Sequence, residues 1–118
     1  MDKEKEMKDR TKKFALEVIK YSESLRGDRA LDVLARQLLR SGTSIFLNYR
    51  AVCRAKSIAD FLNKLSIVEE EADEAAGCLE LLRDSGLSIG EKNEKLMDEA
   101  NQITAIIVAS IKTARKSK

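Results

Sequence analysis

Residues 36–54 read RQLLRSGTSIFLNYRAVCR, and this stretch decides the fold. Its apolar and small residues recur at alternating spacings of three and four, which is the pattern of one buried helical face. The positions on this face are Leu34, Leu38, Ser41, Ile45, Asn48 and Val52. We therefore expect a long amphipathic helix, and the small residues Ser41, Gly42 and Ser44 should allow a partner helix to approach closely.

The opposite side of the same helix is basic. Four arginines fall within roughly 80° of one another at ~100° per residue, and they extend over about 27 Å of helix. They are Arg36, Arg40, Arg50 and Arg54, and Lys56 follows just beyond them. Guanidinium groups pair well with phosphate, and no aromatic residues alternate with these arginines. We therefore expect the five residues to bind a nucleic-acid backbone without reading its sequence.

Three further apolar residues, Leu39, Phe46 and Leu47, lie between the buried face and the basic side. One bundle core cannot bury all of them, and exposed apolar residues of this kind often mark contacts between subunits. These three residues predict an interface in a homo-oligomer.

Charge is segregated along the chain, although the net charge is only +2. Residues 33–68 contain six basic residues and one acidic residue, whereas residues 69–84 contain seven acidic residues and one basic residue. Two interpretations remain open, and they do not exclude each other. The basic helix presents its charge to an anionic partner, or its arginines pair with Glu70 or Glu74 of a neighbouring subunit.

The same three-four spacing recurs in three further segments, so the chain should contain four helices. The expected bounds are 2–25, 29–54, 58–84 and from 88 towards the C-terminus. Links of only a few residues make neighbouring helices antiparallel. We predict an all-α, antiparallel up-down-up-down four-helix bundle that forms a single domain over residues 1–118, with residues 1–12 frayed or projecting.

Local signals mark the ends of these helices. Gly27 can adopt the left-handed conformation that ends the first helix, and Asp28 can cap the second. Ser57 is the predicted N-cap of the third helix. Ser88 and Glu91 have the spacing of a capping box, which predicts that the fourth helix begins near Ser88.

The composition argues against catalysis. Histidine is absent, which removes the commonest general base and the commonest metal ligand. Ser41 and Asn48 have no base to activate them, and the third-helix carboxylates should face solvent. Cys53 and Cys78 lack the spacing of a zinc site, so we expect two reduced thiols. We predict no enzymatic activity, no cofactor and no metal.

Two further absences suggest a location. No apolar run approaches the ~18 residues that a membrane-spanning helix needs. The N-terminal residues MDKEKE are charged and lack the apolar segment of a signal peptide. We therefore expect a cytoplasmic protein that does not bind membranes.

Residues 37–45, QLLRSGTSI, followed by Asn48, resemble the second-helix signature of the four-helix-bundle proteins encoded by intervening sequences in bacterial 23S rRNA genes. That signature runs roughly Q-L-x-R-A-x-x-S-I-x-x-N. Residues 60–67 and 79–86 resemble later parts of the same family. The accessory variability proteins of diversity-generating retroelements share this fold and look similar too. The family usually continues after the asparagine with an Ile-Ala-Glu-Gly-like segment, whereas residues 49–52 read YRAV, a more basic segment that suits the accessory-protein branch.

The resemblance implies ring-like homopentamers, some of which bind nucleic acid and a reverse transcriptase. It therefore leads us to expect a non-enzymatic homopentamer that binds RNA or DNA backbone, with a reverse transcriptase as a candidate protein partner. The alternative is a purely structural, protein-scaffolding ring that does not bind nucleic acid.

Overall fold

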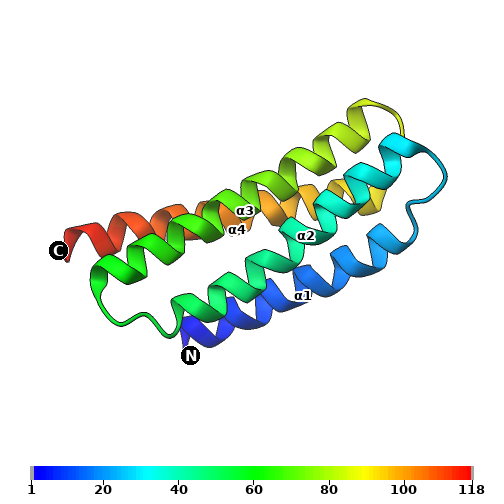
Figure 1. Ribbon diagram of the computed structural model, residues 1–118. Coiled ribbons are helices and arrows are strands. Elements are labelled where there is room, and N and C mark those ends of the chain that lie inside the picture. The colour runs from blue at the N-terminus through cyan, green and yellow to red at the C-terminus, as the bar shows by residue number, and fades with distance from the viewer. Residues whose placement is uncertain (1, 118) are drawn as a thin grey trace.

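Four α-helices run the length of the molecule, and the computed structural model describes residues 2–117 (Figure 1). The helices are α1 (Lys3–Glu23), α2 (Arg29–Val52), α3 (Ile58–Asp84) and α4 (Glu91–Lys116). Successive helices run in opposite directions, and the bundle is an elongated rod of 48 × 22 × 20 Å. Residues 2–117 contain no strand. The predicted all-α, antiparallel four-helix bundle is confirmed.

The first and last helices bury the faces that their spacing indicates. In the first segment the buried positions at three-four spacing are Met7, Thr11, Phe14, Val18, Tyr21 and Leu25. In α4 they are Leu96, Ala100, Ile103, Ile107 and Ile111. α1 begins at Lys3, and the Asp2 side chain caps it by accepting a hydrogen bond from the Glu4 N–H. The segment expected to fray or project is therefore helical from residue 3, and it contributes Met7 and Thr11 to the core.

α2 buries a wider face than the sequence suggests, because it packs against both α1 and α3. The predicted positions that are buried are Leu38, Ser41, Ile45 and Val52. Leu34 and Asn48 are only half-buried. A second buried row, at seven-residue spacing, consists of Ala35, Gly42 and Tyr49. A β-carbon at Gly42 would lie 2.8 Å from Val18 Cγ1, so this second row faces α1.

The start of α4 differs from the prediction. Ser88 and Glu91 form no capping box: α4 begins at Glu91, and Gly90, with a φ of 131°, is its N-cap residue. The Ser88 hydroxyl instead lies 2.5 Å from the Tyr21 hydroxyl. Tyr21 also accepts a hydrogen bond from the buried amide of Asn93. Ser88 therefore joins the α3–α4 link to α1. The N-cap position expected for Ser88 is held by Gly90, because a positive φ strains residues other than glycine.

The neighbouring pairs of helices do not pack equally. α1 and α4 contact each other less than the three sequence-adjacent pairs do. Near mid-length Arg10 joins them, donating to Glu99 at 2.7 and 2.8 Å and to Gln102 at 2.7 Å. Beyond Arg10 a cavity opens between them towards the chain termini. As a result, Ile58 is 44% exposed and Phe61 is half-buried, although their spacing on α3 matches that of its buried positions.

Candidate nucleic-acid interface

The predicted basic residues do lie on one side of the bundle. Arg36, Arg40 and Arg50 project from the outer side of α2, opposite the buried row of Leu38 and Ile45. Arg54 lies in the turn that follows α2, and that turn continues the helical path because the Arg54 N–H donates to the carbonyl of Ala51. All four arginines and Lys56 are exposed. We call Arg36, Arg40, Arg50, Arg54 and Lys56 the basic face.

Arg40 differs from the other members of the basic face because two carboxylates of α3 hold it. Its Nη1 donates to Glu71 at 2.9 Å, and its Nη2 donates to Glu74. The hydrogen bonds that the Arg40 guanidinium donates to Glu71 and Glu74 raise its pKa. At this position basic α2 therefore pairs with acidic α3 within one chain, whereas one interpretation of the sequence had Glu70 or Glu74 pairing with arginines of a neighbouring subunit.

The rest of the basic face has no such partners. Among residues 2–117, no ion pair involves Arg36, Arg50, Arg54 or Lys56. Arg50 lies over the Phe46 ring, with 6.0 Å from its Cζ to the ring centroid, a geometry that leaves the guanidinium N–H groups open to an anion. These four side chains can therefore pair with phosphate at little cost in broken contacts.

A second group of basic residues lies on α4, which packs against α1 and α3 and does not contact α2. The C-terminal end of α4 lies at the same end of the bundle as the α2–α3 link (Figure 1). It contributes the exposed side chains of Lys112, Arg115 and Lys116. Cations in the last turn of a helix are favoured by the helix dipole. The up-down topology predicts that they share one end of the bundle with Arg54 and Lys56, since the second and fourth helices both end there.

An apolar patch lies on the α1–α2 side of the bundle. Leu39 and Phe46 are half-buried, but they are not among the apolar side chains that pack onto the core. Both lie on the side of α2 that carries Gly42 and faces α1. On α1, Leu16 and Ile19 are exposed, and sequence reasoning did not single them out. We call Leu16, Ile19, Leu39 and Phe46 the apolar patch.

Leu47 does not share the position of Leu39 and Phe46. It is 59% exposed and stands seven residues from both Arg40 and Arg54, a spacing that places it on the basic side of α2. The three residues predicted as one interface thus divide between two surfaces, because a step of one residue rotates a side chain by ~100°.

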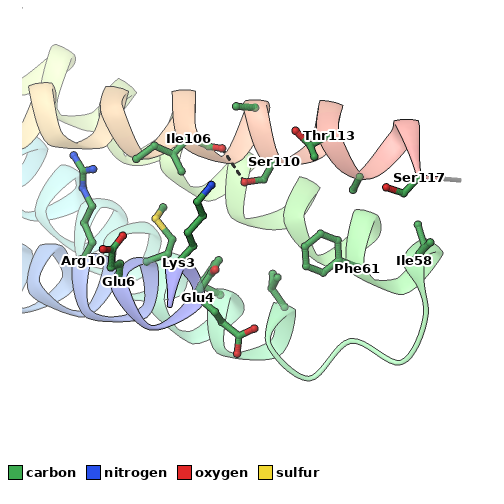
Figure 2. A pocket seen from close by; sticks show the side chains of 15 residues that line it. Lys3, Glu4, Glu6, Arg10, Ile58, Phe61, Ile106, Ser110, Thr113 and Ser117 are labelled. Atoms are coloured by element: carbon green, nitrogen blue, oxygen red, sulfur yellow. Dashed lines mark hydrogen bonds between the residues drawn. The ribbon is translucent and has the colours of Figure 1, made fainter. Parts of the chain in front are cut away.

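A cavity opens between α1 and α4 at the end of the bundle where α4 ends (Figure 2). It has a volume of about 920 Å³, and the apolar side chains in its lining include Met7, Val52, Phe61 and Ile106. Ser110, which also lines it, donates its hydroxyl to the Ile106 carbonyl of its own helix. Arg10 at the inner edge is engaged by Glu99. The lining is mostly apolar and places no activated nucleophile towards the space.

Both thiols should react slowly in the folded protein. Cys53 is half-buried and Cys78 is buried, and burial raises the pKa of each thiol. The thiolate is the reactive form, so we expect Ellman's reagent at pH 8 to react at least about tenfold more slowly in buffer than in urea. Cys53 should react before Cys78. Two thiols that react in buffer as fast as in urea would contradict this packing.

Residues 2–117 contain neither a group of metal-ligating side chains nor a helix that could span a membrane. Residues 2–117 contain no group of three or more cysteine, aspartate or glutamate side chains arranged to hold a metal ion. None of the four helices combines the length and the hydropathy required to cross a membrane. The surface that remains as a candidate site is the basic face.

Comparisons with known proteins place the chain in a family. Residues 3–109 match a family model described as 23S rRNA-intervening sequence protein. A crystal structure from Bacteroides thetaiotaomicron VPI-5482, of a protein with unknown function from the S23 ribosomal protein family, has 35% sequence identity and a TM-score of 0.83. The match covers 90% of this chain and 98% of that one. A comparison with curated proteins found no match. The chain therefore belongs to the family of 23S rRNA-intervening sequence proteins.

Proposed function

We propose that this protein is a non-enzymatic homo-oligomer that binds the backbone of RNA or DNA through its basic face. The observation that carries the proposal is that Arg36, Arg50, Arg54 and Lys56 are exposed on one side and make no ion pair within residues 2–117. Guanidinium forks match phosphate oxygens, and binding of this kind releases counterions.

The geometry of the basic face favours backbone contact over base recognition. Arg50 and Arg54 are one helical turn apart, and Lys56 follows in the same link, so three cations gather at one end of the bundle. The Phe46 ring lies beneath the Arg50 guanidinium. A ligand would therefore meet charge before it met a stacking surface, and its affinity should depend on salt more than on sequence.

The apolar patch supports the oligomeric part of the proposal. Its α1 members are exposed and its α2 members are half-buried, and apolar side chains of this kind are stabilised when a second copy covers them. A ring of five copies, and a reverse transcriptase as a protein partner, are carried over from the family resemblance. A closed ring would repeat the basic face around its circumference and multiply its phosphate contacts.

Charge reversal at the end of the basic face tests the nucleic-acid part. We expect the double variant Arg50→Glu, Arg54→Glu to bind a 30-nucleotide RNA, and DNA of the same sequence, about 100-fold more weakly. The slope of log affinity against log salt should become shallower by about 1.4 to 1.8, which corresponds to two lost phosphate contacts. Fluorescence anisotropy across a salt series measures both quantities, and light scattering checks that the mass is unchanged.

The matched control is Lys12→Glu, Lys13→Glu, which reverses two exposed cations of α1 outside the basic face. It should lower the affinity far less. Equal losses of affinity in the two double variants would mean that only the overall charge matters, and they would contradict the assignment of the basic face as the binding surface. If the natural protein retained neither nucleic acid at low salt, the scaffolding ring would replace our proposal; a single-chain mass in solution would refute both.

A further inference from the structure

The middle of the basic face carries its own counter-charges. Arg40 is 54% exposed, yet Glu71 and Glu74 both accept hydrogen bonds from its guanidinium. One positive charge therefore faces two negative charges, and the local sum is −1. The Glu71 side chain is only 15% exposed, so the α2–α3 packing holds it in place beside Arg40. Any phosphate that approaches Arg40 meets two carboxylates already bound there.

We propose that Glu71 and Glu74 limit the affinity of the basic face by competing with phosphate for Arg40. This inference rests on the proposed function, and it assigns two acidic residues of α3 a role in setting how tightly that surface binds nucleic acid. Carboxylate and phosphate use the same two-point hydrogen bonding to guanidinium, so only one of them can occupy it fully. At Arg40 a phosphate is repelled by both carboxylates, and it can use the two terminal nitrogens fully only where it displaces them.

The competition also divides the basic face. With Arg40 occupied, the available cations are Arg36 on one side and Arg50, Arg54 and Lys56 on the other. Arg36 and Arg50 are 14 positions apart, which corresponds to about 21 Å along a helix. A nucleic acid bound to the natural protein should therefore make its main contacts at the bundle end, with Arg36 as a separate contact. Release of Arg40 would join the two parts.

The direct test removes the two carboxylates and keeps their shape. In the double variant Glu71→Gln, Glu74→Gln we expect the affinity for the 30-nucleotide RNA to rise about tenfold at 0.1 M salt. The salt slope should steepen by about 0.7 to 0.9, which corresponds to one further phosphate contact. Both quantities come from the anisotropy series described above. Circular dichroism at 222 nm confirms that the variant is folded.

A matched control separates competition from a general change in charge. Glu70→Gln, Asp73→Asn removes the same two charges from neighbouring exposed positions of α3 that make no ion pair within residues 2–117. It should raise affinity only slightly and leave the salt slope unchanged. When Arg40→Gln is added to both double variants, their difference in RNA affinity should disappear. The gain in affinity depends on freeing the Arg40 guanidinium, which is then absent.

The outcomes distinguish this inference from the proposed function. If the natural protein binds and the two double variants gain equally, competition for Arg40 is refuted while the basic face stands. A gain in Glu71→Gln, Glu74→Gln that persists without Arg40 refutes it as well. If neither the natural protein nor this variant binds RNA or DNA at low salt, the proposed function fails and the inference fails with it.

Discussion

Replacing Phe14 with alanine should lower the free energy of unfolding by about 3–5 kcal/mol. Phe14 is only 1% exposed, and it belongs to the continuous core that all four helices share. The variant loses the favourable free energy of burying the ring away from water. It also leaves a cavity that the neighbouring side chains cannot fill. A domain of this size has a total stability of about 5–15 kcal/mol, so the variant should be close to unfolding at physiological temperature.

Urea denaturation followed by circular dichroism measures this loss. All samples need the same protein concentration, since association of subunits adds to the apparent stability. Leu81→Ala is the control, because Leu81 is 57% exposed on α3 and its truncation should change stability by no more than about 0.5 kcal/mol. Similar midpoints for Phe14→Ala and Leu81→Ala would mean that Phe14 does not lie in the core.

Replacing Gly42 with leucine should destabilise the bundle by about 2–3 kcal/mol. A β-carbon at this position would lie 2.8 and 2.9 Å from the two γ-carbons of Val18. Val18 is fully buried and β-branched, so it cannot rotate away without strain. α1 and α2 would have to separate, although leucine favours the helical state over glycine by roughly 0.8–1 kcal/mol.

Gly77 provides the matched control for Gly42. It also lies inside a helix, but a β-carbon there would meet no atom within 4 Å. Gly77→Leu should therefore be neutral or slightly stabilising, because the propensity gain has no steric cost to offset. The two variants differ only in what surrounds the glycine. Equal effects on the unfolding midpoint would show that α1 and α2 do not pack closely at Gly42.

The sequence predicts the elements of this bundle well, because a helix in a bundle needs one regular apolar face. Thr11 lies in the core at a position that fits the three-four spacing of its segment, although it is polar. The N-cap at Ser57 is confirmed, since its side chain accepts a hydrogen bond from the Asp60 N–H. The fourth helix was placed three residues too early, because Ser88 satisfies the local pattern of a cap while its hydroxyl is bound to Tyr21.

The candidate site was predictable only in part. Exposure of the four arginines follows from their spacing on one helix, and the structure agrees. The ion pairs of Arg40 with Glu71 and Glu74 could not be predicted from the sequence. These residues are 31 and 34 positions apart, and they meet only when two helices pack at a given rotation and height. The same reason explains why Tyr49, rather than Asn48, is buried: α2 is rotated towards α1.

By itself, the sequence determined the number of helices, their approximate bounds, their antiparallel order and the side of α2 that bears positive charge. These properties depend on the three-four spacing of apolar residues and on the short links between helices, and both can be read from local sequence. Only the tertiary structure decided which arginines remain unpaired, where the apolar patch lies, and that α1 and α4 separate beyond Arg10. Those features depend on the relative rotation of whole helices, which is set by the fit of many side chains at once.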